Sequence, residues 1–320
     1  MQPIVARILL VALAGLPATV PAYDSTDMDI CLKQAVATAR DDATVGELRS
    51  TCAAQLAGSS SIALRHRKEL SLRDNRFAIT AHRPNYLLLA AHDTRGSIDT
   101  GLDPGTGKDT ESHFQVSMKF PVWQDLAGIQ RLDLYAAYTN RSFWQVYDQA
   151  NSAPFRETNH EPELWLSAPV SWQMGGLTNR AVRLGLSHQS NGRSGELSRS
   201  WNRLFGELIF DRGHYSGSLK TWWRLPDKGD DDNPDIEDYL GIFQLTNVLT
   251  HKKHSFSAML RAALESGVRG TAQLDWTFPL GDHRHFAGHL QWFNGYGYSL
   301  IDYDHRVNVF GIGVSLTDWL

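Results

Sequence analysis

A histidine, a serine and an asparagine stand close together near the middle of the chain, at His188, Ser190 and Asn202. A serine hydroxyl becomes a useful nucleophile when a neighbouring base takes its proton, and the base works best when a third group fixes its tautomer and orientation. An asparagine amide can orient the imidazole of the base as a carboxylate does. These three residue types therefore predict a hydrolase with Ser190 as nucleophile, His188 as base and Asn202 as orienting group.

The segments on either side of residues 191–199 alternate between apolar and polar residues, and residues of equal parity in a strand share one face. The catalytic candidates have the same parity as the apolar residues of both segments, which are Val182, Leu184 and Leu186 before the loop and Leu204, Leu208 and Phe210 after it. The candidates are therefore expected on the apolar face of two adjoining strands. A nucleophile on an apolar outer face suits a lipid substrate.

The same alternation continues from about Tyr86 to the end of the chain, in segments separated by Gly, Asn and Asp turns. About twelve strands are expected, which predicts an all-β fold, a twelve-stranded antiparallel transmembrane β-barrel with polar residues inside. A soluble β-sandwich also alternates but turns its apolar face inward. Connections that alternate between long and short, together with ten Trp and ten Tyr, favour the barrel.

The first residues have a cationic start, an apolar run and small residues before Ala22, which is typical of a secretory signal peptide at 1–22. A membrane anchor is the alternative, but Gly15 and Pro17 interrupt the run. Residues 23–80 are expected to form a periplasmic segment that begins with a helical hairpin. Cys31 and Cys52, the only cysteines, are expected to form a disulfide in an oxidising compartment. Residues 81–320 then form the barrel domain.

The charged residues are mixed along the chain. The 31 basic and 35 acidic residues give a net charge of -4, with no basic block, which argues against nucleic acid as a partner. Oxygen-bearing side chains gather instead around the candidate site. The loop 191–199 carries Ser194, Glu196 and Ser198, and an acidic cluster around Asp232 follows on a later loop. Oxygen ligands of this kind suit a hard cation such as Ca²⁺, although acidic clusters are more often solvated loops.

The chain resembles the outer membrane phospholipase A family from about Asn75 to its C-terminus. The resemblance rests on HQSNGRS at 188–194, SRSWNR at 198–203, SAPFRETN at 152–159, DDNPDI at 231–236 and GYGYSLIDY at 295–303. It implies a twelve-stranded barrel in the bacterial outer membrane that hydrolyses both acyl esters of glycerophospholipids, depends on Ca²⁺ and is active as a homodimer.

The resemblance also implies roles for single residues. The backbone amides of Ser190 and Gly192 would form the oxyanion site. Calcium ligands would be the Arg193 carbonyl, Ser198 and the carbonyl of Ser152 of the partner subunit, with Asp232 at a second calcium position. The family usually has an acidic calcium ligand where this chain has Gly195, and Glu196 is expected to take its place. A glutamine of the family's dimer interface corresponds to Asn140, whose amide can still bond between lipid-facing surfaces.

An even number of strands with an internal N-terminus places the loops 93–111, 146–161, 191–199 and 225–237 on the external side. The active site is therefore expected near the outer leaflet, towards the cell surface. Two other functions are open from the residues: a passive channel or binding barrel lined by Lys119, Arg131 and Arg261, and an outer-membrane protease. A narrow barrel packed with side chains would conduct poorly, and a protease would carry its acidic catalytic groups away from the lipid face.

Overall fold

The computed structural model describes residues 25–57, 62, 65, 69, 72, 75, 78–96, 108–226, 231–263, 269–281 and 286–317. The signal peptide expected at 1–22 lies outside the described residues. The chain divides after Ala57 into two compact units.

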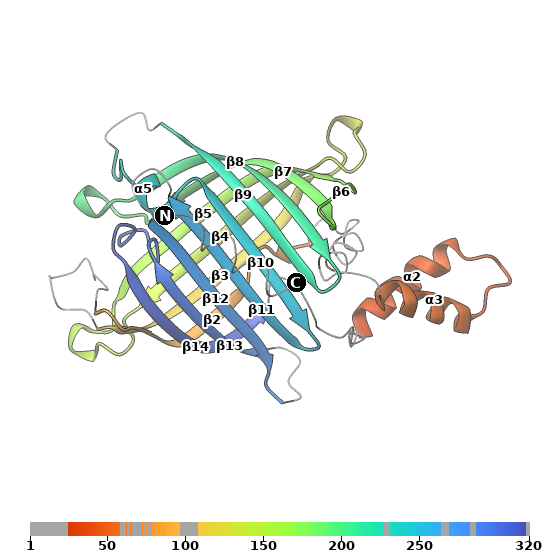
Figure 1. The fold of residues 1–320 in the computed structure, drawn as a ribbon, viewed down its shortest axis with the longest axis horizontal. Helices are drawn as coiled ribbons and strands as arrows, with labels where there is room; N and C mark the ends of the chain where they lie inside the picture. Colours follow the sequence, from red (N-terminus) through yellow and green to blue (C-terminus); the bar gives the residue numbers. More distant parts are fainter. Residues whose placement is uncertain are drawn as a thin grey trace. The chain divides into compact units, whose positions relative to one another are not determined.

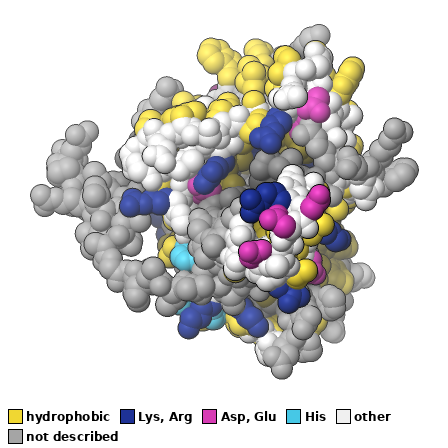
Figure 2. Space-filling view, turned by 90° about the vertical axis from the view of Figure 1, so that its right-hand side faces the viewer, with side chains coloured by type: hydrophobic (Ala, Val, Ile, Leu, Met, Phe, Trp, Pro, Cys, Tyr) yellow, Lys and Arg dark blue, Asp and Glu magenta, His cyan; other side chains and the backbone are white. Residues whose placement is uncertain are grey.

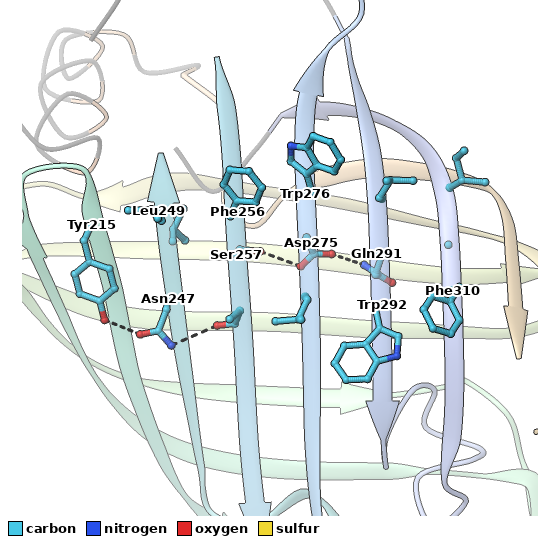
Figure 3. A pocket seen from close by; sticks show the side chains of 16 residues that line it. Tyr215, Asn247, Leu249, Phe256, Ser257, Asp275, Trp276, Gln291, Trp292 and Phe310 are labelled. Atoms are coloured by element: carbon cyan, nitrogen blue, oxygen red, sulfur yellow. Dashed lines mark hydrogen bonds between the residues drawn. The ribbon is translucent and has the colours of Figure 1, made fainter. Parts of the chain in front are cut away.

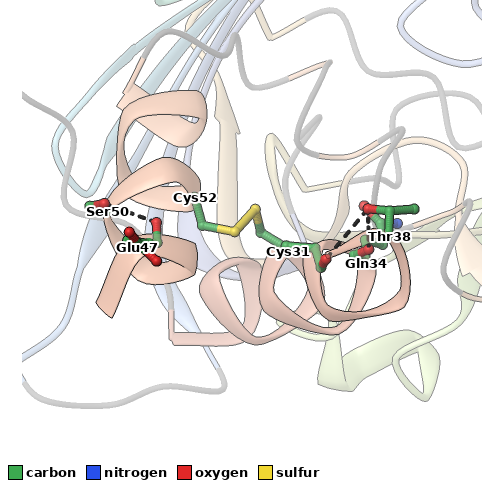
Figure 4. The surroundings of a disulfide bond; sticks show 7 residues. Cys31, Gln34, Thr38, Glu47, Ser50 and Cys52 are labelled. Atoms are coloured by element: carbon green, nitrogen blue, oxygen red, sulfur yellow. Dashed lines mark hydrogen bonds between the residues drawn. A yellow bond between two sulfur atoms is a disulfide. The ribbon is translucent and has the colours of Figure 1, made fainter. Parts of the chain in front are cut away.

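The N-terminal unit is a pair of helices, α2 (Ser25–Thr38) and α3 (Val45–Ala57). A capping box begins α3, because Glu47 accepts a hydrogen bond from the Thr44 backbone N–H at 2.8 Å and donates its own N–H to the Thr44 hydroxyl. A disulfide joins Cys31 to Cys52 across the pair (Figure 4). The predicted hairpin and its disulfide are confirmed. Neither these helices nor any other described helix has the length and apolar character needed to cross a membrane.

The second unit is a closed antiparallel barrel (Figure 1). Its twelve strands are β2 (Asn85–Asp93), β3 (Thr110–Trp123), β4 (Asp133–Trp144), β5 (Phe155–Pro169), β7 (Leu177–Ser190), β8 (Ser200–Arg212), β9 (Tyr215–Leu225), β10 (Phe243–His251), β11 (His254–Ala263), β12 (Arg269–Pro279), β13 (Ala287–Gly295) and β14 (Val307–Thr317). Each strand pairs with its neighbours in the chain, and β14 pairs with β2 to close the sheet. The predicted twelve-stranded barrel is confirmed.

Shorter elements decorate the barrel. Two two-residue strands pair at its margins, β1 (Thr80–Ala81) with β3 and β6 (Gln173–Met174) with β7. The connections carry the single-turn helices η2 (Leu126–Gly128), η3 (Gln149–Asn151) and η4 (Gly195–Leu197), and the short helix α5 (Glu237–Leu240). The helix α5 interrupts the alternation of apolar and polar residues just before β10.

The apolar face of the strands looks outward. On β7, Val182, Leu184 and Leu186 are 41 to 56% exposed, whereas Ser187 between two outward residues is 3% exposed. Figure 2 shows hydrophobic side chains gathered along the upper margin of the molecule. A soluble sandwich requires the opposite arrangement, so this alternative to the barrel is excluded. An apolar wall around a polar interior matches a protein whose solvent on the outside is lipid.

Ion pairs fill the barrel interior. Arg156, which is fully buried, pairs with Glu111 at 2.9 Å and with Asp302 at 2.5 Å. Further pairs are Arg83–Glu161 and Arg83–Glu163, in which Arg83 precedes β2, and Arg183–Glu207 and Arg203–Glu161 between strands. A cavity of about 100 Å³ remains among these residues, enough for only a few water molecules. This packing speaks against the channel considered from the sequence.

Candidate active site

The candidate catalytic residues lie on the hairpin formed by β7 and β8. These strands pair in a register that sets His188 opposite Asn202 and Ser190 opposite Ser200. Strand alternation turns all four side chains to the outer wall, beside the exposed Leu186 and Leu204. The structure thus brings together the three residues selected from the sequence, on the face that meets lipid.

His188 and Asn202 are hydrogen-bonded across the two strands. The Nδ1 atom of His188 is 2.9 Å from the Oδ1 atom of Asn202. An amide oxygen can only accept, so Nδ1 carries the hydrogen and Nε2 keeps its lone pair. Ser190 follows His188 by two residues on the same strand face. An imidazole held in this tautomer can take a proton from a neighbouring hydroxyl through Nε2.

The loop between the two strands is organised by Asn191, which is 6% exposed. Its Oδ1 accepts the backbone N–H groups of Arg193 and Arg199, at 3.3 and 3.0 Å, and its Nδ2 donates to the Leu197 carbonyl at 2.9 Å. Gly192, next along the chain, has a φ of 67°, a left-handed backbone that glycine adopts at no steric cost. The loop is therefore fixed directly after the nucleophile candidate, and Gly192 leaves its backbone open to a substrate.

Two of the calcium candidates are in contact. The Ser198 hydroxyl donates to the Asp232 carboxylate at 2.6 Å. The acidic loop is anchored here by Asn233, which is fully buried and whose Oδ1 accepts the Ser200 N–H at 2.9 Å. Two loops that are distant in sequence therefore place a hydroxyl and a carboxylate side by side, a donor set that suits a hard cation.

The other calcium candidates have no described contact with Ser198 or Asp232. Glu196 lies exposed in η4, directly after Gly195, whose φ is 66°. The Arg193 guanidinium is 3.4 Å from the Glu157 carboxylate. Ser152 lies on the β4–β5 loop in a left-handed conformation, and no described contact joins it to the loop 191–199. Among the described residues there is no group of three or more His, Cys, Asp or Glu side chains that could hold a metal, so a cation here would need hydroxyl and carbonyl oxygens in addition to carboxylates.

A phenol holds the acidic loop from the other side. Tyr303, between β13 and β14, donates its hydroxyl to the Asp235 carboxylate. Burial, together with the neighbouring Asp235 carboxylate, raises the pKa of the Tyr303 phenol. The hydroxyl therefore stays protonated at neutral pH and remains a donor. This contact explains why the run at 295–303 accompanies the site in the sequence.

Two residues near the site were missed from the sequence. His160 on β5 pairs in register with both Asn140 on β4 and Ser190 on β7. The Tyr138 hydroxyl is 2.6 Å from the Nδ1 atom of His160. The parity of the apolar residues Leu164 and Leu166 on β5, extended back through Pro162, reaches His160, so alternation is the signal in the sequence that could have found it.

Another hollow on the barrel lies away from these residues. It is an apolar groove of about 640 Å³ along β9 to β14 (Figure 3). The Tyr215 hydroxyl donates to Asn247 at 2.6 Å at one side of it, and Phe256, Trp276 and Trp292 contribute aromatic walls. None of the candidate catalytic residues lines it. A shallow apolar groove on an outer wall suits contact with lipid chains, and the hydrogen-bonded hairpin of β7 and β8 is the better candidate for chemistry.

Comparisons with known proteins show the family of the chain. A family model described as Phospholipase A1 matches residues 62–316. Proteins named Phospholipase A1 are 37% identical in Proteus vulgaris and 36% identical in Escherichia coli K12, each over 251 residues that cover 78% of this chain and 85% of the relative.

Solved structures are similar as well. The outer membrane phospholipase A from Escherichia coli has a TM-score of 0.71 and 34% identity, covering 77% of this chain and 95% of that one. The Salmonella typhi outer membrane phospholipase, solved as a dimer with bound calcium, has a TM-score of 0.71 and 33% identity, covering 77% of this chain and 94% of that one.

Proposed function

This chain belongs to the phospholipase A1 family and folds as a β-barrel of the bacterial outer membrane, and from that premise we propose that it cleaves the sn-1 and sn-2 acyl esters of glycerophospholipids with a Ser190, His188 and Asn202 triad, in a calcium-dependent reaction. The observation that carries the proposal is the His188–Asn202 hydrogen bond beside Ser190 on the lipid-facing wall. Polar side chains on such a wall cost free energy against lipid, which a catalytic role accounts for.

The proposed reaction has two halves. Ser190 Oγ attacks the ester carbonyl carbon and passes its proton to His188 Nε2, and the resulting intermediate breaks the bond to the alcohol oxygen, which takes the proton from His188. The acyl group is then on Ser190 and the lysophospholipid leaves. Water, deprotonated by His188, attacks the acyl-serine, the fatty acid leaves and Ser190 regains a proton.

The other residues position these groups. Asn202 keeps the hydrogen on His188 Nδ1 and stabilises the imidazolium that forms in each half reaction. The backbone N–H groups of Ser190 and Gly192 are proposed as donors to the oxyanion. The left-handed conformation of Gly192 supports this role, because a residue without a side chain there lets substrate approach the backbone.

The oxygen donors around Ser198 fit a calcium ion. Ser198 and Asp232 already lie within hydrogen-bond distance, and the proposed ligand set adds the Arg193 carbonyl, Glu196 in place of the residue missing at Gly195, and the Ser152 carbonyl of the partner subunit. When bound, the ion supplies positive charge that stabilises negative charge developing on the substrate. The calcium-bound dimer of the Salmonella typhi relative supports both the ion and the pairing.

The proposed dimer places Asn140 between two barrels. Its amide lies on the outer wall one strand away from His160, and its Oδ1 accepts the Ser142 hydroxyl at 2.9 Å. An amide facing lipid can bond to a second barrel. The site is proposed to face the cell surface, because the loops at this barrel end include the longer ones, as external loops of such barrels do.

The test is fatty-acid release from detergent-dispersed phospholipid. Ser190→Ala is expected to lower kcat by about 10⁴ or more, as removal of a serine nucleophile does. Ser200→Ala is the matched control, because Ser200 is the cross-strand neighbour of Ser190 on the same wall and is expected to retain activity. Equal activity of the wild type and Ser190→Ala would overturn the assignment.

A further inference from the structure

A second imidazole stands beside Ser190. His160 on β5 lies across from Ser190 in the strand register, whereas His188 precedes Ser190 on the same strand. Cross-strand neighbours on one face have Cβ atoms about 5 Å apart. Ser190 therefore has an imidazole on each of two sides, one along β7 and one across on β5.

The hydrogen bonds of His160 indicate which nitrogen carries its hydrogen. The Tyr138 hydroxyl lies 2.6 Å from Nδ1, and the Asn140 amide nitrogen lies 3.5 Å from the same atom. Both neighbours can donate, and the amide nitrogen can only donate. Nδ1 is therefore the acceptor, and the hydrogen is on Nε2.

The Nε2 edge of His160 faces the loop that follows the nucleophile. A methyl group placed on the α-carbon of Gly192 would lie 3.8 Å from both Nε2 and Cδ2 of His160. Gly192 is the residue whose backbone N–H is proposed for the oxyanion site. The Nε2 donor of His160 is thus beside the proposed oxyanion site. Because His160 pairs with Ser190 in the strand register, this donor lies level with Ser190 along the barrel wall.

We propose that His160 is a further catalytic residue, which donates its Nε2 hydrogen to the carbonyl oxygen of the ester under attack and to the oxyanion that forms from it. Tyr138 is its positioning residue, because the phenol holds Nδ1 as an acceptor and so keeps the hydrogen on Nε2. The assignment rests on Ser190 being the nucleophile. The strand register favours the ester over the headgroup phosphate as the partner, because the phosphate lies several bonds further from the attacked carbon.

The test compares His160→Ala, His160→Gln and Tyr138→Phe on two substrates, detergent-dispersed phosphatidylcholine and a short-chain p-nitrophenyl ester that lacks phosphate. Loss of one oxyanion donor lowers kcat by about 10²-fold. His160→Ala is expected to lose about that much kcat on both substrates with little change in KM. His160→Gln keeps an N–H donor and is expected to recover part of the loss, and Tyr138→Phe to show a smaller loss than His160→Ala.

Three results would overturn the proposal. The first is an unchanged kcat in His160→Ala, and the second is a loss of kcat on phosphatidylcholine alone, which would indicate a contact with phosphate. The third is a loss of kcat that is accounted for by a smaller folded fraction, measured by heat-modifiable gel mobility. Should His160→Ala fold poorly, the kcat of His160→Gln and Tyr138→Phe relative to wild type decides, and unchanged values in both overturn the proposal. Ser190→Ala is measured alongside. If it retains wild-type activity, the proposed nucleophile is wrong, whereas an inactive Ser190→Ala with a fully active His160→Ala overturns His160 alone.

Discussion

Asn202 offers the sharpest test of how the triad works. Its Oδ1 atom is the partner of His188 Nδ1 at 2.9 Å, and the register of β7 and β8 holds the two residues opposite each other. Replacing Asn202 by Leu keeps the branched shape of the side chain and removes the acceptor. Replacing it by Asp keeps the acceptor. The two variants therefore separate the hydrogen bond from the packing of the side chain.

The size of the effect follows from the kind of bond. His188 becomes an imidazolium in each half reaction, and a hydrogen bond to a charged group contributes about 1.5 to 3 kcal/mol, while about 1.4 kcal/mol corresponds to a tenfold change in rate. Asn202→Leu is therefore expected to lower kcat by about 10- to 150-fold, far less than the loss of about 10⁴ or more in Ser190→Ala. Asn202→Asp is expected to stay within about threefold of the wild type, because a carboxylate oxygen also accepts from Nδ1.

The assay is kcat for fatty-acid release from detergent-dispersed phospholipid at saturating calcium. Asn202→Leu and Asn202→Ala should agree with each other, because both lack the acceptor. The reasoning fails if Asn202→Leu equals the wild type, or if Asn202→Asp and Asn202→Leu lose the same activity. Either result would mean that the hydrogen bond to His188 does not contribute to the rate.

Three other predictions follow from the site and its supports. Glu196→Ala and Asp232→Asn should each raise the free calcium concentration needed for half activity, in a calcium-buffered titration, and an unchanged value would remove that residue from the ligand set. Asn140→Ala should weaken the proposed calcium-dependent dimer by about threefold, the contribution of about one hydrogen bond in a membrane, as measured by sedimentation equilibrium in detergent, and equal dimerisation would place the interface elsewhere. Burial opposes ionisation of Glu69, but Lys119 at 2.8 Å and Arg65 lower its pKa from 4.5 to about 2. The ion pairs of Glu69 therefore contribute about 3 kcal/mol at most to the stability of the fold. This contribution is present above about pH 4.5 and is lost as the pH falls towards 2. Thermal unfolding should show a smaller acid-induced loss in Glu69→Gln than in the wild type, and identical pH profiles would contradict this assignment.

The sequence predicted the barrel because its signal is local. Alternation on β7 is visible in the sequence as Val182, Leu184 and Leu186, and the same residues are exposed on the outer wall. Which face is outward does not follow from alternation itself, since a sandwich gives the same pattern. Connection lengths and aromatic content favour a barrel with its apolar face outward, and the closed pairing of β14 with β2 confirms the barrel.

The residues that the sequence missed depend on pairing between distant strands. His160 is thirty positions from Ser190, and the two meet because β5 and β7 pair in one register. A one-residue slip in that register would turn every side chain of β5 to the other face. The contact between Ser198 and Asp232 likewise depends on two loops, and no periodicity in the sequence fixes how loops meet. The three residues of the proposed triad can be recognised in the sequence because they lie on a single hairpin.

The packing of the barrel decides where its chemistry can take place. Arg156 and its carboxylate partners, with the other buried ion pairs, leave little free volume inside, so a phospholipid reaches polar groups only at the outer wall. A site on an open wall is accessible to lipid from the side at all times, and its activity must therefore be limited by something other than entry. In the proposed ligand set, Ser152 lies on a different loop from Ser198, with no described contact between them. Under that proposal a single chain would lack one of its calcium ligands, and pairing with a second chain would complete the site. Control of the activity by assembly is then the expected consequence of a nucleophile on the outer wall of a filled barrel.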